Sequence, residues 1–169
     1  MGMQWKTFIF AGLVFAGHVP AQQTAAVYKV AIEVSDYPLV FVSVQVNDRQ
    51  VRALLDTGSS SAVRKSSRLA RELKLALVAD TKASVQGLDG RRLAMECGKL
   101  DTLSLGGMLD KNVDVEFTGD RVESVSSQVG TPFDLILGWG FLSRYHFLLD
   151  YRRGLLLFSE GPLPPPCQG

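Results

Sequence analysis

The residues Leu54-Leu55-Asp56-Thr57-Gly58-Ser59-Ser60 place one carboxylate directly after an apolar run. The two leucines predict a buried strand that ends at Asp56 and is followed by a sharp turn. Gly58 permits a close approach of the backbone, and the flanking hydroxyl groups can donate hydrogen bonds to the carboxylate. A carboxylate in this position is either the cap of a turn at a strand end or a catalytic group. This stretch alone leaves both interpretations open.

The composition is that of an ordinary globular domain. The chain has 169 residues, of which 46% are hydrophobic and 21% charged, so we expect one domain with a hydrophobic core. The net charge of +1 argues against nucleic acid as the main partner, because such proteins normally present a basic face. The histidines, His18 and His146, are far apart, and no cluster of side chains has the spacing of a metal site. We therefore expect no metal and no cofactor.

Residues 1–21 have the pattern of a secretory signal peptide. Lys6 supplies the positive charge, residues 7–17 are mainly apolar, and Val19-Pro20-Ala21 supplies small residues for cleavage after Ala21. A membrane anchor is the alternative, but a span needs roughly 20 apolar residues and this run is shorter. We expect a periplasmic or secreted bacterial protein, with no stable membrane insertion once the signal is removed. The domain would then cover residues 22–160, before a Pro-rich tail at 161–169.

Export has a consequence for the two cysteines of the mature chain. An oxidising compartment allows a disulfide between Cys97 and Cys167, which would attach the tail to the body of the domain. Spacing alone does not decide whether the bond forms.

Most of the domain is expected to be β-structure. Residues 28–34, 39–46 and 51–55 have the Val-rich alternation of strands, and the last two form a hairpin around a turn at 47–50. A helix is expected at 67–75 because Leu69 and Leu73 share one face. Strands are also expected at 100–105 and 113–117. Residues 118–131, which are mostly polar, are expected to form an exposed loop.

Two further segments are distinctive. Residues 83–105 predict a long hairpin with Gly87, Leu88, Asp89 and Gly90 at its turn, which is either a plain hairpin or a mobile flap over a groove. The apolar run at 133–138 ends in glycine and precedes a short helix at about 140–145. A last hairpin spans residues 148–158.

Two of these motifs together resemble one family. The Asp56-Thr57-Gly58-Ser59 stretch is similar to the active-site loop of the aspartic proteases, and Leu137-Gly138 resembles the second half of their psi-shaped motif. The order of elements over about residues 28–158 resembles the retropepsin-like branch, including single-domain forms exported by bacteria. This resemblance implies a mainly β fold: a closed barrel of antiparallel hairpins with one or two short helices.

The resemblance also implies roles for individual residues. Asp56 would be the catalytic carboxylate, and Thr57 would bond across to the loop of a symmetry partner. Gly58 would allow the loops to approach, and Ser59 would donate a hydrogen bond to Asp56. The hairpin turn, Gly87 to Gly90, would cover a bound peptide.

Hydrolysis of a peptide bond by carboxylates needs two of them sharing one proton. Asp134 and Asp150 lack a following Thr-Gly, so the chain supplies half a site, and a homodimer acting on peptides or proteins is expected. The alternatives are a non-catalytic peptide-binding or assembly module with the same fold, and a secreted β-barrel in which Asp56 only caps a turn.

Overall fold

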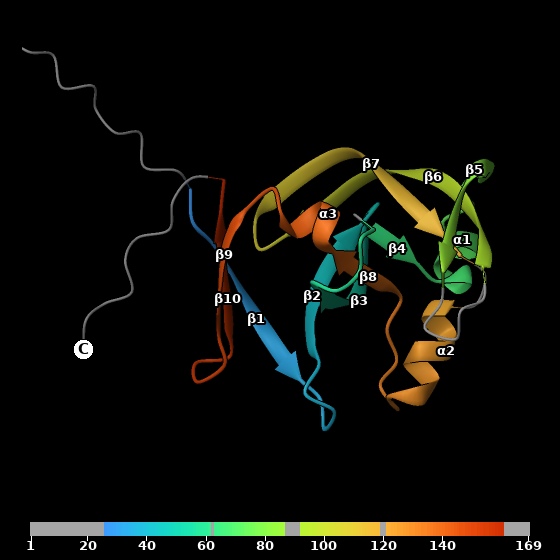
Figure 1. The fold of residues 1–169 in the computed structure, drawn as a ribbon. Coiled ribbons are helices and arrows are strands. Elements are labelled where there is room, and N and C mark those ends of the chain that lie inside the picture. Colours follow the sequence, from blue (N-terminus) through green and yellow to red (C-terminus); the bar gives the residue numbers. More distant parts are fainter. Residues whose placement is uncertain (1–25, 62, 87–91, 119–120, 161–169) are drawn as a thin grey trace, which may run out of the picture.

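The computed structural model describes residues 26–61, 63–86, 92–118 and 121–160, and these are mainly β-structure (Figure 1). The strands are β1 (Tyr28–Val34), β2 (Val40–Val46), β3 (Arg49–Asp56), β4 (Val63–Lys65), β5 (Val78–Gln86), β6 (Arg92–Leu105), β7 (Met108–Phe117), β8 (Leu135–Gly138), β9 (His146–Asp150) and β10 (Leu155–Ser159). The helices are α1 (Ser67–Glu72), α2 (Arg121–Gln128) and α3 (Trp139–Leu142).

Six of the strands close into a barrel. Their order is β6-β7-β4-β8-β3-β2, and pairing of β2 with β6, at Gln45 with Ser104 and Val46 with Leu103, completes the circle. The barrel confirms the expected fold class. Two of its pairings, β3 with β8 and β4 with β7, are parallel and are therefore not hairpins.

The β2–β3 hairpin delivers Asp56 to the end of a strand. Its turn is tighter than the sequence suggested, because Asn47 and Asp48 both have positive φ, 43° and 66°, as a two-residue hairpin turn requires. Val42, Val44 and Val46 of β2 face the main core, whereas Phe41 packs with Leu54 in a second cluster on the other face. Apolar side chains on both faces explain why this hairpin is buried.

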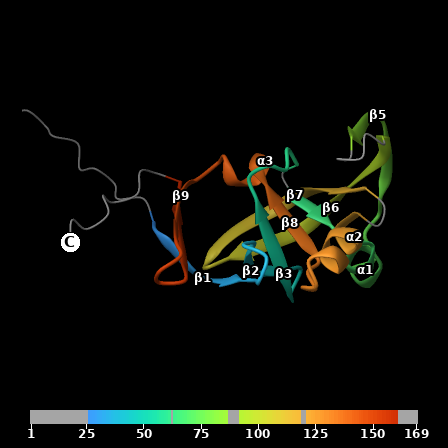
Figure 2. The same ribbon diagram turned by 60° about the horizontal axis from the view of Figure 1, so that its bottom comes forward.

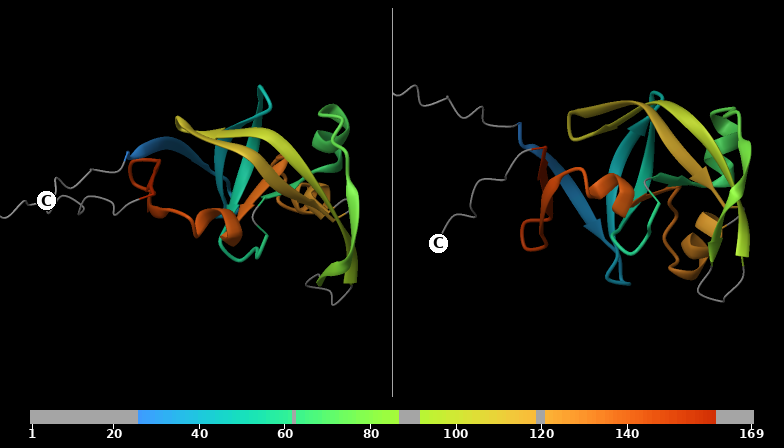
Figure 3. Two further views of the ribbon diagram at one scale, coloured as in Figure 1. Left: turned by 90° about the horizontal axis from the view of Figure 1, so that it is seen from above. Right: turned by 45° about the horizontal axis from the view of Figure 1, so that its top comes forward.

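A small sheet projects from one side of the barrel. Strand β1 pairs with β2 at one end and with β10 at the other, and β10 pairs in turn with β9. Figure 3 shows this sheet on the opposite side of the barrel from α1. Tyr28 packs against Phe158, with ring centroids 5.1 Å apart, so the first and last described strands lie side by side.

The prediction of a loop at 118–131 is wrong, because residues 121–128 form α2. Val122 of this helix is 1% exposed and packs in the second cluster with Phe41, Leu54, Phe133 and Ile136. Helices α1 and α2 lie side by side at one end of the molecule (Figures 1 and 2). The described residues thus form three short helices where one or two were expected.

Other boundaries shift by a few residues. Helix α1 ends at Glu72, because Lys74 adopts a positive φ of 49°, and α3 begins at Trp139. The expected strand at 100–105 is the second half of β6. The signal sequence, Cys167 and the Pro-rich tail lie outside the described residues. None of the helices within the described ranges has the length and hydropathy needed to cross a membrane.

Lys65 in β4 is a buried cation. It is 0% exposed, and its Nζ lies 4.4 Å from the centroid of the Phe117 ring. Nζ donates no hydrogen bond within the part of the chain that the structure describes. Burial lowers the pKa of Lys65 to about 8, although the carboxylates of Glu96 and Glu123 oppose this effect. The charged form is therefore unfavourable for folding at neutral pH.

Lys65→Met is expected to raise the free energy of unfolding at pH 7 by about 1–3 kcal/mol, because methionine fills a similar volume without a charge. The unfolded chain binds more protons than the folded one between about pH 8 and pH 10.5. The wild type should therefore gain stability as the pH rises through this window, and the variant should lack that gain. Thermal unfolding at pH 7 and pH 10 checks both points. A melting temperature of the variant below that of the wild type at pH 7 would contradict the expected gain in stability.

Candidate active site

The site forms on three neighbouring strands of the barrel, at the end of β3. Strand β8 lies between β3, which runs parallel to it, and β4, which runs antiparallel. The register places Leu55 beside Leu137 and Asp56 beside Gly138. The two motifs that the sequence singled out therefore meet in space, with the carboxylate at the end of β3.

The loop after Asp56 wraps closely around Gly138. A Cβ atom added to Gly138 would lie 2.2 Å from the carbonyl oxygen of Ser61 and 2.7 Å from that of Ser59. The Trp139 N–H donates to the Ser59 carbonyl at 2.7 Å. Only glycine leaves room for this crossing, so position 138 helps to define the conformation of the loop.

The Asp56 carboxylate is held by its own loop. The Gly58 N–H donates to Oδ1 of Asp56 at 2.9 Å, and the Ser59 N–H donates to the Asp56 carbonyl at 3.1 Å. This is the geometry of a turn capped by an aspartate. Within the described residues Oδ2 accepts no hydrogen bond, so the cap leaves one oxygen of the half-buried carboxylate available for chemistry.

The neighbouring hydroxyl groups are not used in the single chain. Ser59 was expected to donate to Asp56, but its Oγ is buried and has no hydrogen-bond partner among the described residues. Thr57 is exposed, and its hydroxyl makes no hydrogen bond within the same part of the chain. The Thr57 side chain is therefore accessible to a second molecule, whereas the Ser59 hydroxyl is enclosed by its own loop.

A cavity of about 540 Å³ lies against the Asp56 loop. Its walls are mainly apolar, but they also include Arg64 and Arg121, which belong to no motif of the sequence. Among the described residues that line this cavity, Asp56 is the one acid. The described part of one chain therefore contributes one carboxylate to the cavity and to any ligand bound in it.

The other two aspartates considered in the sequence have structural roles. Asp134 accepts hydrogen bonds from Ser66 Oγ at 2.9 Å and from Arg68 Nε at 3.0 Å, at the start of α1. Asp150 accepts hydrogen bonds from the backbone N–H and the guanidinium of Arg153, each at 3.0 Å, in the last hairpin turn. Neither carboxylate lines the cavity beside Asp56.

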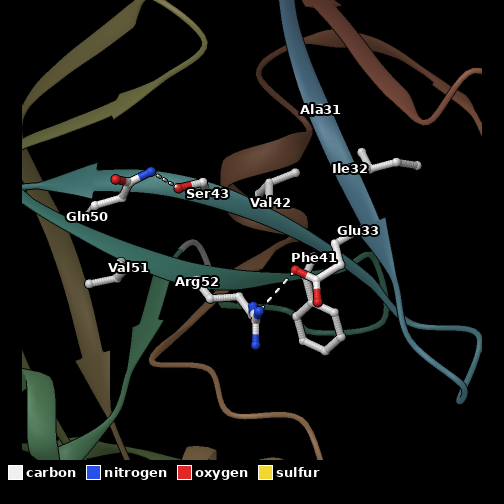
Figure 4. A pocket seen from close by; sticks show the side chains of 9 residues that line it. All are labelled: Ala31, Ile32, Glu33, Phe41, Val42, Ser43, Gln50, Val51 and Arg52. Atoms are coloured by element: carbon white, nitrogen blue, oxygen red, sulfur yellow. Dashed lines mark hydrogen bonds and ion pairs between the residues drawn. The ribbon is translucent and has the colours of Figure 1, made fainter.

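Two further cavities differ from this one in character. One of about 140 Å³ lies beside Thr57 and is mainly apolar, with Leu142, Phe147 and Tyr151 in its walls. The other, of about 580 Å³, lies between β1 and the β2–β3 hairpin and contains an ion pair between Arg52 and Glu33 at 3.1 Å (Figure 4). Asp56 lines neither of them.

The expected flap is described only in part. Strands β5 and β6 pair as the arms of the long hairpin, but Gly87, Leu88, Asp89 and Gly90 lie outside the described residues. No group of three or more His, Cys, Asp or Glu side chains in the described ranges is arranged to hold a metal ion.

Known proteins share the sequence pattern and the fold of this chain. The family model described as Aspartyl protease matches residues 42–141. No curated protein matches the chain. A retropepsin-like aspartic protease from Rickettsia conorii is 17% identical with a TM-score of 0.54, and the match covers 80% of this chain and 92% of that one. This structure has the same fold.

Two other solved structures are less similar in shape. EIAV protease complexed with the inhibitor HBY-793 is 18% identical with a TM-score of 0.37, covering 55% of this chain and 89% of that one. Basic 7S globulin from soybean is 11% identical with a TM-score of 0.41, covering 80% and 42%. TM-scores this low do not establish a shared fold.

Proposed function

Because the chain belongs to the retropepsin-like aspartyl protease family, we propose that it is an aspartic endopeptidase whose active site forms when two copies of Asp56 meet in a homodimer. The observation that carries this proposal is the position of Asp56. It lies at the end of β3 beside Gly138, against a cavity large enough for substrate side chains, and one of its carboxylate oxygens accepts no hydrogen bond from the described part of the chain.

The dimer is needed because the chemistry requires two carboxylates. Two carboxyl groups about 3 Å apart cannot both ionise, so their pKa values separate. The ionised group then takes a proton from water, and the protonated group donates a hydrogen bond to the carbonyl oxygen of the scissile bond. The cavity contains one acid from the described part of the chain, so a second copy of Asp56 supplies the missing group.

The surface around the loop supports an interface there. Thr57 is exposed beside an apolar cavity. Trp139, directly after Gly138, is 55% exposed, and Tyr151 is 59% exposed. Large aromatic side chains of this kind are enriched at protein interfaces. A two-fold axis near Thr57 would cover them and bring the two aspartates together.

The substrate is proposed to be an extended peptide or an unfolded segment of protein. The location is proposed to be the periplasm or the exterior of a bacterial cell, on the pattern of residues 1–21.

Cleavage of a peptide library by residues 22–169 tests the proposed function. We expect cleavage at mildly acidic to neutral pH, a specific activity that rises with protein concentration as dimers form, and inhibition by a statine-type peptide. A non-catalytic binding module would bind the statine-type peptide but cleave nothing. Absence of cleavage at concentrations where the protein is dimeric would contradict the proposal.

Ser59→Ala is expected to move the acid limb of the pH–rate profile upward by about 0.5–1 pH unit, the size expected for the loss of one hydrogen bond to a carboxylate. In the dimer the Ser59 hydroxyl, which is buried without a partner among the described residues, would donate to Asp56 and favour its charged form. Loss of that donor would raise the pKa of the catalytic pair. The pH dependence of kcat/KM measures this, with Ser124→Ala, an exposed serine outside the cavity, as the matched control. An unmoved limb in Ser59→Ala would contradict the assigned role.

A further inference from the structure

Helix α2 presents one face to the cavity that contains Asp56. Arg121 and Val125 are four residues apart in α2, so they share a side of the helix. Val129 directly follows the last residue of α2 and continues this side, because its N–H donates to the Val125 carbonyl at 3.0 Å. All three line the cavity, whereas Val122 is buried in the core behind it. The wall opposite the catalytic loop therefore combines an apolar surface with one cationic side chain.

The two arginines of the cavity differ in their partners. Arg64, with a side chain 7% exposed, lies 3.6 Å from a carboxylate oxygen of Glu116 and also contacts Ser61. Arg121 is half-buried and forms no ion pair with any residue in the described ranges. Within those ranges, no carboxylate compensates its charge.

The position of Arg121 in the helix is also unfavourable locally. It is the first residue of α2, where the helix itself carries a partial positive charge and acidic side chains are preferred. The same turn also carries Glu123, but its carboxylate is engaged by N–H groups of α1 and does not line the cavity, whereas Arg121 does. A residue that violates a local preference in this way is often retained for a function.

Several contacts fix the orientation of α2. Glu123 accepts hydrogen bonds from the N–H groups of Ser67 at 2.6 Å and Arg68 at 3.3 Å, at the start of α1. At the other end, Ser126 Oγ donates to the Thr131 carbonyl at 3.1 Å. Since the helix is held at both ends, the side of α2 that faces the cavity is set before any ligand binds.

We propose that Arg121 makes this enzyme selective for substrates that carry an acidic side chain next to the scissile bond. The methylene groups of that side chain would lie against Val125 and Val129, and its carboxylate would accept paired hydrogen bonds from the guanidinium. This inference rests on the proposed peptidase function and specifies its substrate class.

The test compares matched peptides that differ at one position, with Glu or Gln beside the scissile bond. The wild type is expected to cleave the Glu peptide with a kcat/KM about tenfold higher than that of the Gln peptide. Arg121→Gln should bring this ratio close to one, and Arg121→Glu should instead favour a peptide with Lys at that position. Arg152→Gln is the control, because it removes the same charge from an exposed turn outside the cavity and should keep the wild-type ratio.

A second measurement does not depend on catalysis. Asp56→Asn should bind the Glu peptide more tightly than the Gln peptide, and adding Arg121→Gln should remove the difference. Equal use of both peptides by the wild type, or an unchanged ratio in Arg121→Gln, would overturn the inference while leaving the peptidase intact. Preferential binding without any cleavage would support the role of Arg121 and contradict only the proposed peptidase function.

Discussion

Asp56→Asn is expected to lower peptide cleavage at least about a thousandfold. An amide cannot take a proton from water at neutral or acidic pH, and it cannot share a proton with the carboxylate of a partner. The variant should still fold, because the side-chain oxygen of asparagine can accept the hydrogen bond that Gly58 N–H donates to Asp56 at 2.9 Å. The kcat/KM for the best library peptide measures the loss.

The control for this variant is Asp48→Asn. Asp48 is exposed in the β2–β3 turn at a φ of 66°, a conformation that asparagine tolerates well, so the same chemical change should leave cleavage unaltered. Circular dichroism and melting temperature would verify that both variants fold. Equal cleavage by Asp56→Asn and the wild type would mean that the activity arises at another site or from a contaminant.

Gly138→Ala is expected to cost about 3 kcal/mol or more in the free energy of unfolding, which corresponds to a Tm lower by about 6–12 °C. The added methyl group would meet two backbone carbonyl oxygens, those of Ser61 at 2.2 Å and Ser59 at 2.7 Å. Backbone atoms cannot move aside as the end of a flexible side chain can. The loop that carries Asp56 must therefore shift, so activity should fall together with stability.

Gly130→Ala separates this steric effect from the general cost of replacing a glycine. Gly130 has a positive φ of 66°, but an added Cβ would meet no atom within 4 Å. Its substitution should cost only about 1 kcal/mol, through backbone strain. If the melting temperature of Gly138→Ala were no lower than that of Gly130→Ala, the close contact between Gly138 and the loop after Asp56 would be contradicted.

The strands were the most predictable part of the fold. The alternation of valines in β2 predicts a strand because side chains of a strand point to opposite faces in turn. The meeting of Asp56 with Gly138 could not be derived from periodicity, because a parallel pairing of β3 with β8 joins segments far apart in the chain. That juxtaposition was expected only through the family resemblance.

Helix α2 was missed for an identifiable reason. Its serines are typical of loops, and they obscured an apolar spacing of Val122, Val125 and Val129 that ends just before Gly130, which has a positive φ. With the helix overlooked, nothing in the sequence placed Arg121 near Asp56. The hydrogen bond expected from Ser59 to Asp56 is not formed among the described residues, where the Ser59 Oγ is buried without a partner.

Under the proposed mechanism, each active site contains two copies of Asp56. A test is to mix wild type with Asp56→Asn at constant total concentration and to let the subunits exchange. If a site needs both carboxylates, activity should follow the square of the wild-type fraction, so an equal mixture should retain about one quarter of the wild-type rate. Retention of about one half, with activity proportional to the wild-type fraction, would show that each chain acts alone and would contradict the account.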